Sequence, residues 1–159
     1  MKAKGTVILP DGIACSGKST YSRKISKERG AVLLIVDEIL LTFGVTDFAS
    51  MGKAMGYVNQ LAADIASAGA DVVLESGYFK KEERDRMKQY FKDRDIPYEW
   101  RYLDVSDETW RKNIALRNAA HANGETNVYP MDEAMVEMFE KNYTVPERDE
   151  VDVWIDNNW

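Results

Sequence analysis

The amino-acid sequence predicts a three-layer α/β domain, in which helices cover both faces of a mainly parallel β-sheet. The main observation is that short apolar runs alternate along the chain with stretches whose apolar residues recur at helical spacing. No low-complexity linker or internal repeat divides the 159 residues, so we expect a single domain over residues 1–159. The composition, with 45% apolar and 30% charged residues, is typical of globular proteins.

The first three expected elements are a strand, a helix and a strand. Residues 6–9 are a short apolar run and predict the first strand. Residues 18–29 predict a helix, because Tyr21 and Ile25 lie one turn apart. Residues 31–36, AVLLIV, form a continuous apolar run of the kind found in strands that are covered on both faces.

The middle of the chain repeats this alternation. Residues 54–65 carry apolar side chains at helical spacing, and Gly69 is a natural stop for that helix. Residues 72–74 predict a buried strand. Residues 80–94 predict a charged helix with a narrow apolar stripe, and residues 97–105 alternate like a strand.

Two helices and a strand are expected in the last third of the chain. Asp107 is a candidate N-cap for a helix that runs on through Arg117. Residues 118–130 are rich in Ala, Asn, Gly and Thr and predict a mobile connection. Residues 131–141 resume the helical pattern, and residues 151–155 predict a final strand.

Charge and cysteine content exclude several classes of protein. The formal net charge of −6 argues against a nucleic-acid-binding surface. Cys15 is the sole cysteine and His121 the sole histidine, so the sequence offers no internal disulfide and none of the usual zinc sites. No apolar run approaches the roughly 18 residues that cross a bilayer, and the first residues lack a charged-then-apolar leader pattern. We therefore expect a cytoplasmic protein without a membrane partner; the sequence predicts no particular oligomeric state.

The segment GIACSGKS, residues 12–19, fits the Walker A pattern of phosphate-binding loops. Glycines let such a loop wrap its N–H groups around a phosphate, the lysine adds a positive charge, and the serine hydroxyl binds Mg²⁺. The segment follows an apolar strand and opens a helix, whose positive end favours an anion. The predicted nucleotide-binding residues are Gly12, Ile13, Ala14, Cys15, Ser16, Gly17, Lys18, Ser19 and Thr20.

Acidic residues follow two of the expected strands. Asp37 and Glu38 come directly after AVLLIV, and Glu75 comes directly after DVVL. Ligands of open α/β sheets bind beyond the carboxyl ends of the strands, so these carboxylates should converge on the phosphate end of the sheet. There one could orient Mg²⁺ and another could accept a proton from a hydroxyl. The alternatives are a helix cap for Asp37 and a purely structural role for Glu75.

Residues 111–130 are a candidate lid. Arg111, Lys112 and Arg117 lie on the helix that leads into the expected mobile connection. Arginine from a mobile segment commonly stabilises the charge that develops on a transferred phosphoryl group. Arg117, which is nearest the connection, is the favoured residue; the alternative for all of them is an exposed, solvated face.

Five segments occur in a fixed order, namely GIACSGKST, VDEI, VVLESG, WRKNIALRN and VPERDEVDVW. With them the chain resembles, over nearly its whole length, the small P-loop kinase-like proteins grouped as AAA-type ATP-binding domains. That group is related to zeta toxins, chloramphenicol phosphotransferase and polynucleotide kinase. The resemblance implies a P-loop NTPase fold with a five-stranded sheet of order 2-3-1-4-5, ATP with Mg²⁺ as phosphate donor, and a hydroxyl as acceptor.

The resemblance also assigns roles by position. Asp37 matches the acid after the second strand that acts as base in the kinases of the group. Arg117, followed by Asn118, matches the second of two lid arginines that stand four residues apart. VPERDE matches a region near the adenine pocket. The nucleotide loop is carried by Gly12, Gly17, Lys18, Ser19 and Thr20.

Three positions depart from the pattern of the group. Asn113 stands where the first lid arginine is expected, so another basic residue of that helix would have to replace its charge. Glu75 replaces an aspartate. Pro10 and Asp11 replace the apolar pair that ends the first strand. Pro10 lacks an N–H for a central ladder, and we expect Asp11 to bring negative charge toward a triphosphate and to weaken nucleotide binding.

The first hypothesis is an ATP-dependent kinase that phosphorylates a hydroxyl of a small molecule. Its catalytic residues would be Lys18, Asp37 and Arg117, with Ser19 and Glu75 as ligands of Mg²⁺. We expect acceptor specificity in residues 42–56 and 76–81. The second hypothesis is a nucleotide-binding switch or slow NTPase that acts through a protein partner, and the third a related protein that binds no nucleotide. Tryptophans that could serve a partner contact or the core are Trp100, Trp110, Trp154 and Trp159.

Overall fold

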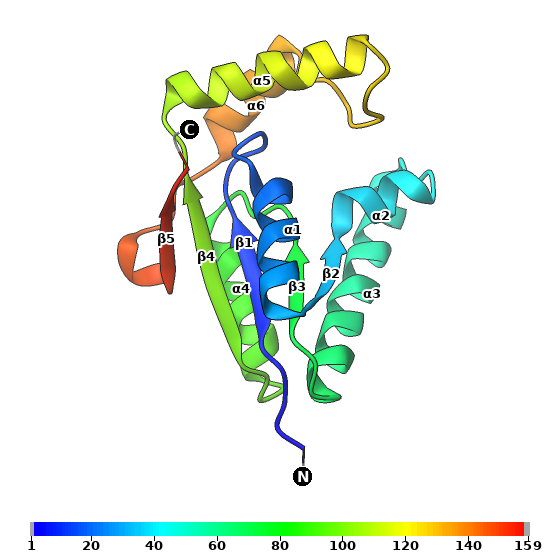
Figure 1. Cartoon of the computed structure of the whole chain (residues 1–159), viewed down its shortest axis with the longest axis vertical. Coiled ribbons are helices and arrows are strands. Elements are labelled where there is room, and N and C mark those ends of the chain that lie inside the picture. Colours follow the sequence, from blue (N-terminus) through cyan, green and yellow to red (C-terminus); the bar gives the residue numbers. More distant parts are fainter. Residues whose placement is uncertain (1, 158–159) are drawn as a thin grey trace.

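The computed structural model describes residues 2–157. These residues form a five-stranded sheet of order β2-β3-β1-β4-β5, in which all neighbouring strands are parallel (Figure 1). This architecture and strand order confirm the predicted fold. The strands are β1 (Val7–Asp11), β2 (Val32–Ile35), β3 (Val72–Glu75), β4 (Tyr98–Asp104) and β5 (Val153–Asp156).

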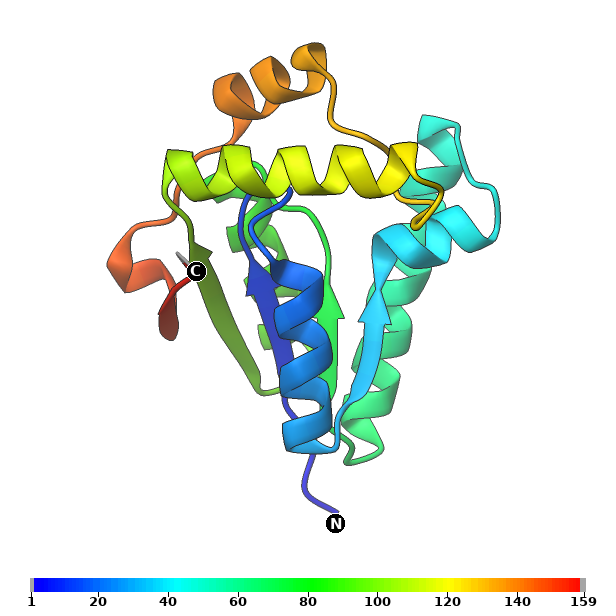
Figure 2. The same cartoon turned by 45° about the horizontal axis from the view of Figure 1, so that its top comes forward.

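Helices cover both faces of this sheet, which gives the three layers (Figure 2). α1 (Lys18–Arg29) packs on one face. α3 (Phe48–Ser67) and α4 (Lys81–Lys92) pack on the other. The helix over residues 18–29 has the predicted bounds, whereas α3 begins six residues earlier than residues 54–65, because Asp47 caps it by accepting a hydrogen bond from the Ser50 N–H at 2.8 Å.

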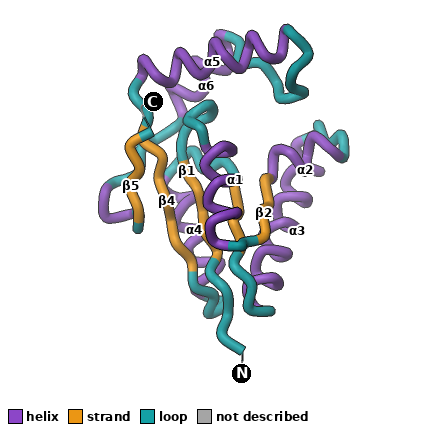
Figure 3. The backbone as a smooth tube through the Cα atoms, in the orientation of Figure 1, coloured by secondary structure: helices purple, strands orange, loops and turns teal. Residues whose placement is uncertain are grey.

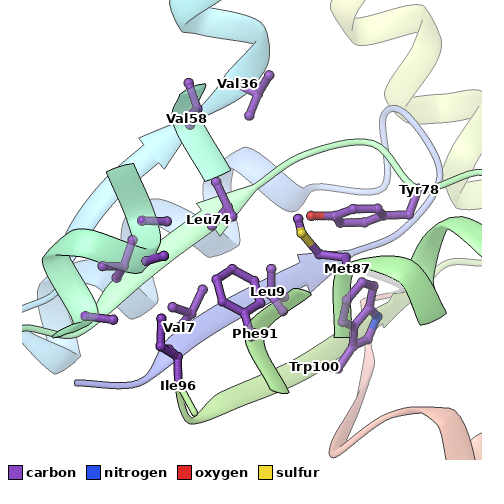
Figure 4. Close-up of a cluster of buried hydrophobic side chains, with 14 residues drawn as sticks. Val7, Leu9, Val36, Val58, Leu74, Tyr78, Met87, Phe91, Ile96 and Trp100 are labelled. Carbon is purple, nitrogen blue, oxygen red and sulfur yellow. The ribbon is translucent and has the colours of Figure 1, made fainter. Parts of the chain in front are cut away.

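The side chains of β1 alternate between the two layers, because successive residues of a strand point to opposite faces. Ile8 packs with Ile25 of α1. Leu9 points into the larger core on the other face, where it packs among side chains that include Phe91 and Trp100 (Figure 4). The central strand is thus anchored on both sides directly before the Walker A segment.

The remaining helices gather at the carboxyl end of the strands (Figure 3). α2 (Val36–Thr42) follows β2 directly, and α5 (Asp107–Ala122) follows β4 and lies across the top of the sheet in Figure 1. α6 (Glu133–Asn142) and the 3₁₀ turn η1 (Arg148–Glu150) lead back to β5. No helix in residues 2–157 is long and apolar enough to cross a membrane.

β1 runs further than residues 6–9, because Pro10 and Asp11 are buried and pair with β4. On its other side, β1 pairs with β3 only at Val7 and Ile8. The ladder toward β3 has therefore ended before the proline, which has no N–H to donate. The strand tolerates Pro10 for this reason.

Two expectations for the last third of the chain are wrong. The N-cap of α5 is Ser106, not Asp107, since the Ser106 hydroxyl accepts the hydrogen bond of the Thr109 N–H at 3.2 Å. α5 also continues to Ala122, so the first residues of the expected mobile connection are helical. The Asn118 side chain binds both the N–H and the C=O of Met131, at 2.7 and 2.9 Å, and so supports the extra turn.

β2 is also less covered than its apolar run predicts. Val32 is 40% exposed, because β2 lies at the edge of the sheet and has a strand neighbour on one side alone among the described residues. A continuous apolar run reports burial on average and does not distinguish an edge strand from a central one.

The tryptophans within residues 2–157 serve the fold. Trp100 and Trp110 are buried, and Trp154 packs edge-on against Tyr102 with ring centroids 4.6 Å apart. Trp159 lies outside the described residues. These rings therefore add no support for a partner surface.

Candidate active site

The Walker A segment connects β1 to α1, and its backbone carbonyls are held from outside the loop. The Ala14 carbonyl accepts a hydrogen bond from the Trp110 indole N–H at 2.6 Å. Asn113 donates its amide to the Cys15 carbonyl at 2.9 Å, and Asn157 donates to the Ser16 carbonyl at 2.6 Å. These carbonyl dipoles are therefore satisfied by α5 and by the end of β5 and are not left facing an anion.

Gly17 lies at the point where the loop becomes helix. Its φ of 92° is in the left-handed region, and a Cβ there would lie 2.6 Å from the Asn157 amide nitrogen. The position therefore requires glycine for conformation and for space. No side chain caps α1, so the N–H groups of its first turn are open at the positive end of the helix. This is the arrangement that binds phosphates.

Lys18 lies along the inside of the loop. Its Nζ donates to the Gly12 carbonyl at 2.6 Å and to the Ile13 carbonyl at 3.2 Å. The ammonium group is thus next to the open N–H groups of α1, where it can exchange these carbonyls for phosphate oxygens.

Asp11 faces the core and not the nucleotide side of the loop. Its carboxylate is fully buried and accepts hydrogen bonds from the Gly12 N–H at 2.7 Å and the Trp100 indole N–H at 3.1 Å. Desolvation by burial raises the pKa of Asp11, although the Trp100 hydrogen bond and the positive charges of Lys18 and Arg84 oppose this shift. Asp11 is absent from the walls of the cavity described below, so the expectation that its side chain crowds a triphosphate is not supported.

Ser19 and Glu75 meet at the carboxyl end of β3. The Ser19 hydroxyl donates to Glu75 Oε1 at 2.9 Å. The second carboxylate oxygen, Oε2, is buried without a hydrogen-bond partner in residues 2–157. A hydroxyl beside an unsatisfied carboxylate oxygen fits Mg²⁺, which prefers oxygen ligands. The same residues contain no group of three or more His, Cys, Asp and Glu side chains that could hold a metal by themselves, so such an ion would need phosphate oxygens and water as further ligands.

Asp37 lies in the first turn of α2 and is exposed at the cavity. α2 begins before it, with Ile35 as the N-cap residue, so Asp37 is not the cap of this helix. Its neighbour Glu38 forms an ion pair with Arg23 of α1. Of the two acids after β2, Asp37 is therefore the one that is free to contact a ligand.

Arg117 reaches the loop from α5. Its Nε donates to the Tyr129 carbonyl at 2.8 Å, and its Nη1 lies 3.4 Å from the Cys15 sulfur. Arg111 is held elsewhere, by Asp107 at 2.9 Å and by Glu140 at 2.6 Å. Arg111 thus does not replace the missing lid arginine.

One cavity of about 740 Å³ brings these groups together. Its wall includes the Walker A segment, Asp37, Glu75 and Arg117. Parts of the segments expected to select the acceptor, residues 42–56 and 76–81, also line it. Its apolar and aromatic wall consists of Ile35, Leu40, Leu41, Val45, Met51, Tyr78, Phe79, Leu116, Val128, Tyr129, Met131, Met135, Phe139 and Tyr143.

Sequence reasoning missed three residues that shape the loop, namely Trp110, Asn113 and Asn157. The sequence marks Asn113 only as the position of a missing lid arginine, and Trp110 only as a tryptophan for the core or a partner contact. Asn157 lies just after β5, Asp37 lies just after β2, and Glu75 is the last residue of β3. The rule that polar residues at strand ends meet could therefore have identified Asn157.

Comparison with known proteins places the chain among nucleotide-binding folds. The family model of an AAA domain matches residues 7–144. No protein of curated function matches the chain in sequence. A candidate kinase from Chloroflexus aurantiacus has a TM-score of 0.74 at 17% identity, over 98% of this chain and 90% of that one.

Two further solved structures are similar. The APS kinase of Mycobacterium tuberculosis, in complex with AMPPNP and APS, has a TM-score of 0.67 at 18% identity, over 99% of this chain and 91% of that one. A gluconokinase from Sinorhizobium meliloti has a TM-score of 0.66 at 14% identity, over 100% of this chain and 86% of that one. At these identities the similarity shows the fold.

Proposed function

Because this chain belongs to the AAA domain family of P-loop kinase-like proteins, we propose that it is an ATP-dependent kinase that phosphorylates a hydroxyl of a small molecule. The observation that carries the proposal is that the Walker A loop, the Ser19–Glu75 pair, Asp37 and Arg117 all line one cavity. Kinases among the similar folds are consistent with it.

The donor would bind at the loop. Lys18 and the open N–H groups of α1 would hold the terminal phosphates of ATP. Ser19 and Glu75 would hold Mg²⁺, whose charge would offset that of the phosphates. The helix α5 would keep the loop in its phosphate-binding shape through Trp110 and Asn113.

The acceptor would react beside Asp37. Its hydroxyl oxygen forms a bond to the γ-phosphorus while the bond from that phosphorus to the leaving oxygen of ADP breaks. The hydroxyl proton passes to the Asp37 carboxylate, which has no cationic partner among the described residues. Arg117 would stabilise the negative charge on the transferred group.

The test is to incubate the protein with Mg-ATP and a metabolite pool and to search by mass spectrometry for products one phosphate heavier. Lys18→Ala should lower transfer on the order of a hundredfold or more, because it removes the charge that binds the terminal phosphates. Lys24→Ala is the matched control, since Lys24 lies on the same helix and is exposed. Transfer that survives Lys18→Ala would contradict the proposal.

A slow NTPase or nucleotide switch is the second candidate. The cationic side chains of the described cavity wall are Lys18 and Arg117. Arg111 is paired elsewhere and does not supply the charge of the missing lid arginine, which favours slow turnover over efficient transfer. This function predicts tight binding of Mg-ATP, slow release of phosphate and no phosphorylated acceptor. Absence of any thermal shift with Mg-ATP would exclude both functions.

A further inference from the structure

The charges of the cavity are unevenly distributed. Lys18 and Arg117, its cations, are both bound to the Walker A loop, where the donor phosphates are expected. Toward α2 the wall carries Asp37 and Glu38, and Arg23 offsets the charge of Glu38 alone. Among the described residues, the wall next to Asp37 therefore has no cation for a negatively charged acceptor.

Two buried tyrosines of the wall, Tyr78 and Tyr143, do not change this balance. Burial raises the pKa of the Tyr78 hydroxyl, and the nearby Asp11 charge raises it further. Burial raises the pKa of Tyr143 in the same way. Both phenols stay neutral at physiological pH and act as apolar surfaces with a polar tip.

Much of the remaining wall is apolar, and the part around Phe79 is firmly supported. α2, the segment after it and the start of α3 contribute Leu41, Val45 and Met51. Phe79 stacks on Phe139 with ring centroids 5.1 Å apart and an interplanar angle of 12°. The backbone around Phe79 is fixed as well.

Two contacts hold that backbone. The Phe79 N–H donates to Glu83 at 2.6 Å, and its carbonyl accepts the Thr144 N–H at 2.7 Å. A stacked pair on a fixed backbone is a preformed apolar surface, which favours a ligand with an apolar or aromatic body.

From these observations we propose that the acceptor is an uncharged or cationic alcohol with an apolar body, and that the cavity discriminates against alcohols that carry a carboxylate or a phosphate. The proposal rests on the proposed kinase function and narrows it. An anionic acceptor would meet the Asp37 carboxylate without a cation of the adjacent wall to offset it, because Lys18 and Arg117 lie at the loop that would hold the donor phosphates. An ammonium group would instead be attracted to the carboxylates of this wall.

The test uses three para-substituted benzyl alcohols, which carry a hydroxymethyl, an aminomethyl or a carboxylate group. Binding to the whole protein is measured by calorimetry with Mg²⁺ and a non-hydrolysable ATP analogue, and phosphorylation is measured in parallel with Mg-ATP. We expect the neutral and cationic probes to bind at least about tenfold more tightly than the carboxylate probe.

A positive charge introduced into the wall sharpens the test. Val45 is half-buried in the wall, so Val45→Lys places an ammonium group beside the acceptor region and should improve the relative binding of the carboxylate probe by about tenfold. Phe48→Lys is the matched control, because Phe48 is 92% exposed and lies outside the wall. It should leave the ratio between the probes unchanged.

The outcomes separate this proposal from the kinase assignment. Equal or tighter binding of the carboxylate probe, or no binding of any probe, overturns the proposed acceptor class even if transfer to another compound is found. Binding with the expected charge preference supports the acceptor class. If such binding occurs without phosphorylation of any probe or metabolite, the cavity preference stands and the kinase function fails.

Discussion

At the scale of single residues, Asp11 has a structural role. Its carboxylate joins the first amide of the Walker A loop to Trp100 in the core. A buried carboxylate with two N–H partners stabilises their positions, but its charge is costly to bury, which is why its pKa is raised. The acid therefore fixes the end of β1 under the loop.

Asp11→Val tests this role. The valine leaves the Gly12 N–H and the Trp100 indole N–H without their partner, so we expect the free energy of unfolding to fall by about 2 kcal/mol or more. Mg-ATP binding should weaken, because the loop loses an anchor. Urea denaturation and calorimetry measure the two effects; tighter binding of Mg-ATP would instead show that the acid repels the phosphates.

The raised pKa of Asp11 predicts that the stability lost in Asp11→Val depends on pH. The pKa of Asp11 is raised above its ordinary value of 3.8 in the folded protein, so folding favours the protonated acid. Its contribution to stability is full below pH 3.8 and is lost as the pH rises through the raised pKa. The advantage of the natural protein over Asp11→Val in urea denaturation should therefore be larger in acid than at neutral pH. A constant difference across this range would contradict the shift.

At the scale of elements, the shape of the Walker A loop depends on α5. Asn113 takes the position of an expected arginine, and its side-chain amide donates a hydrogen bond to the Cys15 carbonyl. Cys15 itself has a φ of 64°, an unusual value for a residue other than glycine, so the loop needs external contacts to hold it. The helix thus supports the loop in addition to carrying Arg117.

Asn113→Ala should loosen the loop without unfolding the protein. Loss of one hydrogen bond of about 1 kcal/mol should weaken Mg-ATP binding roughly fivefold. Lys112→Ala is the matched control, because Lys112 is the exposed neighbour on the same helix. Calorimetric titration with Mg-ATP measures both variants, and equal affinities would show that Asn113 does not support the loop.

At the scale of the whole molecule, the sheet gathers residues from distant parts of the chain at one end. The donors to the Cys15 and Ser16 carbonyls lie 98 and 141 positions away in sequence. Ser19 and Glu75 are 56 positions apart. Parallel strands place their carboxyl ends at the same edge, so residues at or just after the ends of β1, β2, β3 and β5 reach one cavity.

The fold itself should not depend on a metal. Because residues 2–157 contain no cluster of three or more potential metal ligands, Mg²⁺ would bind chiefly together with ATP. EDTA should abolish phosphate transfer and leave the unfolding temperature of the nucleotide-free protein unchanged, as measured by calorimetry. A lower unfolding temperature after chelation would reveal a resident structural metal.

The sequence by itself determined the architecture and the chemical centre of the candidate site. The period of the apolar residues predicted the strands and most of the helices, and GIACSGKS predicted a phosphate-binding loop at its observed place between β1 and α1. The positions of Asp37 and Glu75 followed from the rule that parallel strands end at one edge. These patterns are local or topological, so a single chain is enough to show them.

Only the tertiary structure decided which way Asp11 faces, what Asn113 binds and which side chains form the apolar wall. The sequence predicts the Asp11 side chain beside the phosphates. In the structure it points toward the core, where it accepts a hydrogen bond from the indole N–H of Trp100, 89 positions away. Asn113 and Phe79 likewise take their roles from partners in other elements. Hydrophobic periodicity reports which residues are buried; the partner of each polar group depends on how the layers pack.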